Sequence, residues 1–283
     1  MWGLLLLLVA ATAWAQPTKT FFPSDSKDPK QSAGAALLEA YCPGRVVVGE
    51  VIGCRGPCPD VAAFGGEDLG RSMSAVTRGH FLSPQSNDAV LSMSGCEPHS
   101  ESFGGTVLLT RRSQKWTMLW YKAGVDTSQC HKVKLRDGRE ILVCLGGWGG
   151  QGLVETGLWV EDLRAATPMI AGGDERPFFE VWDNTGTCGE NPEDDPKPES
   201  LQYAYVERVE FKNIRGGVPA ISVTAHFGER KMTIQDVDAC INEQNPNKPH
   251  KGLSFLPSTK REKIEFIFDG RTYHRSPTAK DRK

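Results

Sequence analysis

The sequence predicts a mainly β protein that carries disulfides and is exported from the cell. Three observations lead there. Short β-rich runs bounded by turn residues fill most of the chain, there is no regular alternation of strands with helices, and eight cysteines follow an apolar leader. An even number of cysteines behind such a leader is typical of a disulfide framework in an oxidising compartment.

The expected strands begin after residue 44 and continue almost to the C-terminus. The clearest hairpin is centred on Asp137-Gly138, because this dipeptide tolerates the backbone of a tight turn. The β-rich runs are 44–53, 87–95, 104–112, 115–124, 131–145, 176–184, 203–213, 218–228 and 262–276.

The ends of the chain are expected to lie outside the β domain. Residues 1–15 have the apolar run and the Ala-Trp-Ala ending of a signal peptide, with cleavage after Ala15. The apolar run is too short to span a bilayer, so the mature chain should not be membrane-embedded but periplasmic or secreted, in a bacterial setting. We expect a disordered linker over 16–38, a short helix over Ala35–Tyr41, one β-rich domain over 39–275 and a disordered tail over 276–283.

The cysteines are expected to form at least three disulfides and no structural zinc site. Two pairs are preferred: Cys130–Cys144, across the Asp137-Gly138 hairpin, and Cys188–Cys240, between two later loop regions. The other four then pair among themselves, with Cys54–Cys58 and Cys42–Cys96 slightly favoured. The alternative is a zinc site in which Cys96, His99, Cys130 and His131 supply the ligands.

The stretch CLGGWGGQG, from Cys144 to Gly152, contains the spacing G-x-G-x-x-G of dinucleotide-binding turns. That function needs a helix after the last glycine, whereas Gly157 and its β-branched and aromatic neighbours favour a strand. We therefore predict a glycine-rich hairpin loop with Trp148 exposed at its tip. The candidate binding residues are Trp148, Gly149, Gln151 and His99.

The segment GHFLSPQSNDAV, Gly79 to Val90, resembles the FG-GAP or VCBS-type blade motif of integrin-like β-propellers. Gly79, Phe81, Asp88 and Val90 occupy matching positions. The resemblance implies a propeller-like array of four-stranded antiparallel blades and a role in binding or adhesion, with a β-sandwich as the alternative fold. The family binds calcium through loop carboxylates. Only Asp88 is a carboxylate here, so neither calcium nor any other metal or cofactor is expected.

Two functions remain open on sequence grounds. The first is a secreted, non-enzymatic binding module for an unknown protein or carbohydrate partner. The net charge of −2 argues against nucleic acid as that partner. The second is a secreted hydrolase that uses a metal or a carboxylate pair drawn from Glu155, Glu161 and Asp162. No G-x-S-x-G, H-E-x-x-H or P-loop motif is present, which favours the binding module.

Overall fold

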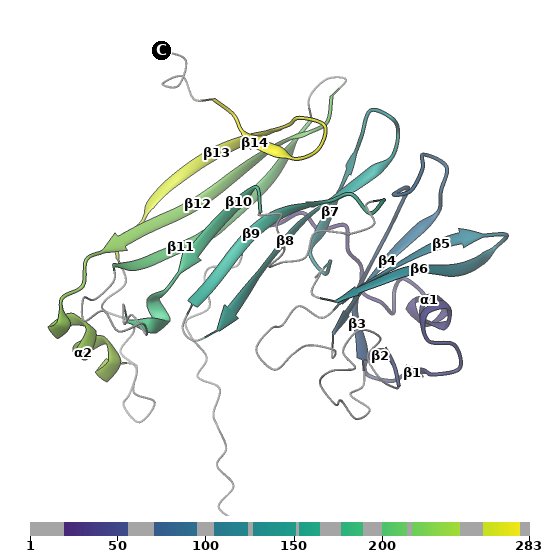
Figure 1. Ribbon diagram of the computed structural model, residues 1–283, viewed down its shortest axis with the longest axis horizontal. Coiled ribbons are helices and arrows are strands. Elements are labelled where there is room, and N and C mark those ends of the chain that lie inside the picture. Colours follow the sequence, from purple (N-terminus) through teal and green to yellow (C-terminus); the bar gives the residue numbers. More distant parts are fainter. Residues whose placement is uncertain are drawn as a thin grey trace, which may run out of the picture.

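The computed structural model describes residues 20–55, 71–94, 105–123, 127–150, 153–164, 177–188, 200–213, 217–243 and 257–277. These residues form three antiparallel sheets and two helices (Figure 1), so the prediction of a mainly β protein is confirmed. Every expected β-rich run contains at least one strand.

The first sheet has six strands that follow one another in sequence order. They are β1 (Val46–Val48), β2 (Ile52–Cys54), β3 (Arg71–Gly79), β4 (Asp88–Ser94), β5 (Gly105–Arg112) and β6 (Lys115–Ala123). Strand β3 was not predicted, because four polar residues interrupt its apolar pattern: Ser72, Ser74, Thr77 and Arg78. Helix α1 (Gly34–Tyr41) covers one face of this sheet, and its position confirms the short helix expected there.

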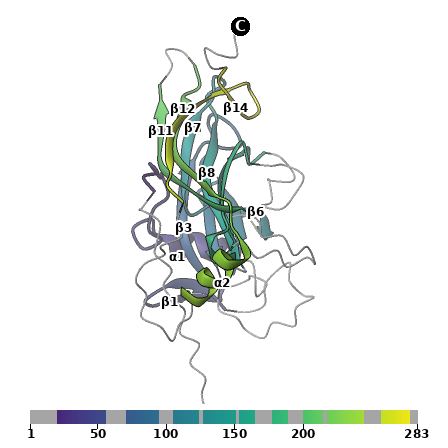
Figure 2. The ribbon, with the colours of Figure 1, turned by 90° about the vertical axis from the view of Figure 1, so that its left-hand side faces the viewer.

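The second and third sheets each have four strands, again in sequence order. The second consists of β7 (Cys130–Lys134), β8 (Glu140–Gly150), β9 (Leu153–Glu161) and β10 (Phe179–Asp183). The third consists of β11 (Leu201–Lys212), β12 (Ala220–Arg230), β13 (Lys260–Phe268) and β14 (Tyr273–Arg275). Figure 2 views the molecule from the side of the third sheet, with helix α2 (Ile234–Glu243) near one end of it.

The three sheets pack face to face, and the second sheet lies in the middle. One face of β8 places Ile141, Val143 and Leu145 in a core shared with the third sheet. The other face places Leu142 and Cys144 in a core shared with the first sheet. Burial on both faces explains why β8 is a continuous apolar run at its start rather than an alternating one.

Residues 20–28, expected in a disordered linker, instead form a strap that bonds to all three sheets. The main-chain N–H of Phe21 donates to Glu207 O of the third sheet at 2.9 Å, and that of Asp25 donates to Cys130 O of the second sheet at 2.8 Å. Lys27 and Val76 of the first sheet exchange two main-chain bonds, of 2.8 and 3.0 Å. The strap is attached by hydrogen bonds of its backbone and of short side chains. Because such bonds need no apolar pattern, the polar composition of the strap is compatible with its ordered position.

The described residues contain three disulfides. Cys130–Cys144 and Cys188–Cys240 are confirmed, and Cys130 stands directly opposite Cys144 in the β7–β8 ladder. The expected pairs Cys54–Cys58 and Cys42–Cys96 are wrong, because Cys42 after α1 is joined to Cys54 in β2. Antiparallel pairing of β1 with β2 brings the end of β2 back toward α1, a non-local effect that spacing along the chain does not reveal. Cys58 and Cys96 lie outside the described residues.

Helix α2 was not predicted, although the sequence contains a start signal for it. Thr233 and Asp236 form a reciprocal cap, in which the Asp236 N–H donates to Thr233 Oγ1 at 3.2 Å and the Thr233 N–H donates to Asp236 Oδ2 at 2.9 Å. The Cys188–Cys240 disulfide attaches this helix to the turn after β10. Within the described ranges, no helix is long and apolar enough to cross a membrane.

Candidate functional site

The glycine-rich stretch is part of a β-hairpin. Gly146 to Gly150 belong to β8, and the chain returns as strand β9 from Leu153, without the helix that a dinucleotide site requires. The strands approach so closely that a Cβ on Gly147 would lie 1.9 Å from Glu155 O. The glycines therefore allow close strand pairing and do not surround a phosphate.

The expectation that Trp148 lies at the tip of the hairpin is wrong, because Trp148 is a strand residue paired with Glu155. The backbone ladder continues from β8 to Gly150, since glycine in a strand does not by itself end pairing. Gly149 pairs with Val154 in the same ladder. Gln151 and His99, the other two candidate binding residues, lie outside the described residues.

Two other tryptophans of the second sheet differ in burial. Trp159 is buried against Gly157, where an added Cβ would lie 2.8 Å from the indole ring. Trp182 on β10, in contrast, is 37% exposed and stands opposite Glu155. The sequence could not separate them, because both occur in similar β-rich runs.

The three candidate hydrolytic carboxylates do not form a pair. Glu155 and Glu161 are six residues apart on one continuous strand, β9. At about 3.3 Å per residue they are separated by about 20 Å, whereas glycosidase carboxylates are about 5–9.5 Å apart. Asp162 instead forms ion pairs with Arg139 and Arg164.

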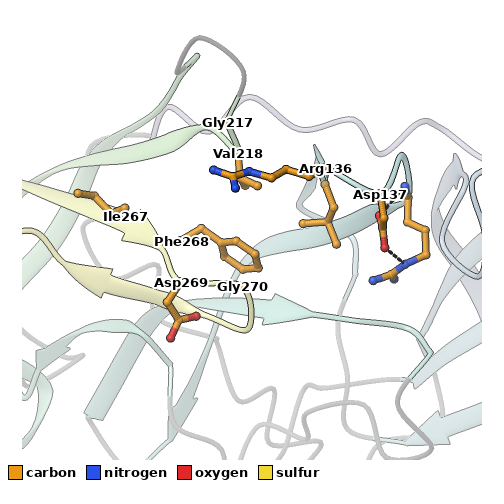
Figure 3. A pocket seen from close by; sticks show the side chains of 10 residues that line it. Arg136, Asp137, Gly217, Val218, Ile267, Phe268, Asp269 and Gly270 are labelled. Atoms are coloured by element: carbon orange, nitrogen blue, oxygen red, sulfur yellow. Dashed lines mark hydrogen bonds and ion pairs between the residues drawn. The ribbon is translucent and has the colours of Figure 1, made fainter.

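A cavity of about 440 Å³ lies where turns of the second and third sheets meet (Figure 3). This volume is within the range of small-molecule sites. Three segments far apart in sequence form its walls: the β7–β8 turn, the residues just before β12, and the β13–β14 turn. Its lining residues are Leu135, Arg136, Asp137, Arg139, Gly217, Val218, Ile267, Phe268, Asp269 and Gly270.

Apolar side chains form much of the cavity surface. Leu135, Val218 and Phe268 each pack against the core between the second and third sheets and are only partly buried there. Ile267 is 48% exposed at the same site. The cavity therefore has a partly exposed apolar wall, and a ligand with an apolar part would remove this surface from water.

The β7–β8 turn places its two arginines differently. The Gly138 N–H donates to Leu135 O at 3.1 Å, and Gly138 has φ +88°, which glycine adopts without strain. Arg139 is buried. Its Nε donates to Asp137 at 2.8 Å, and its Nη1 donates to Asp162 at 3.2 Å. Arg136 is exposed, and Figure 3 shows its side chain extending toward Val218 on the opposite wall.

The carboxylates at this turn are held in their charged form. The Arg139 N–H and guanidinium donate to Asp137 and lower its pKa. Burial acts to raise the pKa of Asp162, but hydrogen bonds from Arg164 and the charge of Arg139 outweigh it, and the pKa is lowered. Two arginines and two aspartates thus form one mutually neutralised network beside the cavity.

Asp269, on the third-sheet side, is occupied by its own turn. Its carboxylate accepts from the N–H groups of Thr272 at 2.9 Å and Arg271 at 2.8 Å, and from His274 Nε2 at 2.6 Å. These bonds lower the pKa of Asp269 to about 2. The group organises the β13–β14 turn, which positions Phe268 in the cavity.

A second polar cluster lies on the outer face of the third sheet. Arg261 donates two hydrogen bonds to Glu207, of 2.7 and 2.9 Å, and His226 Nε2 lies 2.7 Å from the same carboxylate. His226 Nδ1 is 3.2 Å from Thr259 Oγ1. This hydroxyl–imidazole–carboxylate order is that of a nucleophile triad, but the bidentate Arg261 bond commits Glu207 to an ion pair at the bulge of β11.

The fold and the cavity define a disulfide-bonded protein of stacked antiparallel sheets with a ligand-sized site at the sheet ends. Comparison of the chain with protein-family models, with curated proteins and with solved structures finds no match. None of the cavity residues was among the candidates from sequence. The one available signal was the Arg-Asp-Gly-Arg turn, which predicted the hairpin but not what faces it.

Proposed function

We propose that this protein is a secreted, non-enzymatic binding module whose ligand site is the cavity between the β7–β8 and β13–β14 turns. The observation that carries the proposal is a preformed cavity of about 440 Å³ with an apolar wall and a few polar groups at its opening. Such a combination is typical of ligand sites. The classes of ligand that suit such a site include small molecules, carbohydrates and exposed parts of other proteins.

We further propose that the three sheets are blade-like units of an incomplete propeller, related to the FG-GAP or VCBS repeats that Gly79 to Val90 resembles. Sequential antiparallel strand order and face-to-face packing between sheets support this, as do the four strands of the second and third sheets. The first sheet departs from the expected blade, since it has six strands. In propellers, ligands are commonly bound by loops at the blade ends. The cavity lies between such ends.

Export with cleavage after Ala15 is part of the same proposal. The disulfides support an oxidising compartment. N-terminal sequencing of the exported protein should begin at Gln16. Recovery of protein that retains Met1 would contradict the export proposal.

The hydrolase alternative receives no support from the arrangement of its carboxylates. Glu155 and Glu161 are too far apart for either glycosidase geometry, and Asp162 is neutralised by two arginines. Among the described residues no group of three or more His, Cys, Asp and Glu side chains could hold a metal ion. Binding therefore remains the function that the described residues favour.

The cavity can be tested by filling it. Val218→Trp places a large side chain in the cavity, and Val154→Trp makes the same change at an exposed position on β9 outside it. Ligand-observed NMR with a library of anionic, neutral and cationic fragments should give binders that Val218→Trp loses and Val154→Trp keeps. Both variants must first unfold at a temperature close to wild type. Fragments that bind all three proteins equally would contradict this cavity as the site.

A further inference from the structure

We infer that the cavity takes a ligand bearing a single carboxylate on an apolar body, with the guanidinium of Arg136 binding the carboxylate. This inference rests on the proposed function, since it names the ligand class of the same cavity. The geometry that carries it is the position of Arg136, which extends over the apolar wall toward Val218 (Figure 3).

Among the described residues that line the cavity, Arg136 is the cation that remains after the charges are paired. Arg139 is bound to Asp137 and Asp162, and Arg164 to Asp162, as described above. Asp269 accepts from its own turn and from His274. No ion pair joins Arg136 to any described carboxylate, so one positive charge faces the cavity opening.

The number of charges on the ligand follows from this balance. A guanidinium binds the two oxygens of a carboxylate in a planar, bidentate arrangement. A dianion would need a second cation, and it would also lie close to Asp137 and Asp269, which stay negatively charged. A cationic ligand would be repelled by Arg136 and would find both nearby carboxylates already engaged. A monoanion is the charge that the site complements.

The apolar body follows from the wall. Leu135, Val218 and Phe268 line the cavity from three turns, and Phe268 is fixed by contact with Tyr273, at 5.2 Å between ring centroids. A flat or branched apolar group beneath the carboxylate would contact all three. The same chemistry occurs in free organic acids and in peptides that end in an apolar residue with a free C-terminus.

The test compares three probes of one shape and different charge: phenylacetate, 2-phenylethanol and 2-phenylethylamine. Ligand-observed NMR titration of the full-length secreted protein should rank phenylacetate first and 2-phenylethylamine last. Arg136→Gln should weaken phenylacetate binding by about tenfold, the loss expected when a charge-assisted hydrogen bond is removed. It should leave 2-phenylethanol nearly unchanged.

The matched control is Lys134→Gln, which removes an exposed positive charge two residues away on β7, outside the cavity lining. If Lys134→Gln weakens phenylacetate binding as much as Arg136→Gln does, the attraction is due to the overall positive charge of this surface, and the inference is overturned. It is also overturned if phenylacetate does not bind. Neutral or cationic probes that bind as tightly as phenylacetate or more tightly, and are lost in Val218→Trp, would overturn the carboxylate while leaving the proposed cavity site intact.

The source of the carboxylate is resolved by two further probes, N-acetylphenylalanine and its amide. Tighter binding of N-acetylphenylalanine than of phenylacetate, lost in the amide, supports a peptide C-terminus as the ligand. Weaker binding of N-acetylphenylalanine supports a free organic acid. Equal binding of acid and amide would show that the carboxylate is not recognised and would overturn the inference.

Discussion

The carboxylate of Asp88 accepts a 2.8 Å hydrogen bond from the main-chain N–H of Phe81, seven residues earlier. The same Oδ2 atom accepts from the Leu82 N–H at 2.9 Å and from Ser86 Oγ at 2.5 Å. Asp88 and Phe81 are both fully buried. The carboxylate thus organises the loop before β4 through donors of the chain itself, which is a physical reason to expect no calcium there.

Replacing Asp88 should strongly destabilise the protein. Asp88→Ala leaves the Phe81 and Leu82 N–H groups without an acceptor, and we expect a loss of about 3 kcal/mol or more in the free energy of unfolding. Asp88→Asn retains an acceptor oxygen without the charge and should lose about half as much. Urea denaturation of both variants measures this. Calcium at millimolar concentration should not shift any of the curves relative to EDTA, and a clear shift would contradict the calcium-free loop.

The strap should matter through its backbone. Lys27→Pro removes the N–H that donates to Val76 O, whereas Lys27→Ala keeps it. We expect Lys27→Pro to lose about 1–3 kcal/mol of stability, and Lys27→Ala to stay close to wild type. Thermal unfolding and limited proteolysis near residue 27 provide the measurement. Equal stability of the two variants would mean that the strap contributes little to holding the sheets.

The ion pairs of Glu207 predict a pH dependence of stability at acid pH. Hydrogen bonds from Arg261 and then from His226 lower the pKa of Glu207 from 4.5 to about 2. Because the folded-state pKa is the lower one, the stabilising contribution is complete above pH 4.5 and is lost as the pH falls toward 2. Melting temperatures of wild type and Glu207→Gln should differ at pH 6 and converge near pH 2. Glu229→Gln, at an exposed position on β12, is the control and should follow wild type throughout.

The β5–β6 turn offers a stabilising substitution. Ser113 and Gln114 have φ of 45° and 68°, the positive values that a type I′ turn needs and that side chains disfavour. Gln114→Gly should relieve this strain and raise the free energy of unfolding by about 0.5–1 kcal/mol, after the larger unfolded-state entropy of glycine is subtracted. Gln114→Ala retains the Cβ and should give little or no gain. The urea midpoint distinguishes them, and a destabilised Gln114→Gly would show that the glutamine side chain contributes a contact.

Local patterns in the sequence predicted much of the fold. The strands and the Cys130–Cys144 pair could be predicted because side-chain alternation and turn residues act between residues close in sequence. Strand prediction failed where polar residues interrupt a strand, as in β3. The prediction for Trp148 also failed. Gly147 is needed because the facing strand approaches it closely, and the glycine run itself does not reveal that approach.

The sequence by itself determined a mainly β, disulfide-bonded chain and the turn at Asp137-Gly138. Only the tertiary structure decided that Leu135, Val218 and Phe268 share one cavity, that residues 20–28 bond to all three sheets, and that Cys42 pairs with Cys54. The physical reason is the range of the forces involved. Backbone conformation is set by neighbouring residues, whereas the faces that sheets present to each other depend on apolar burial summed over strands far apart in the chain.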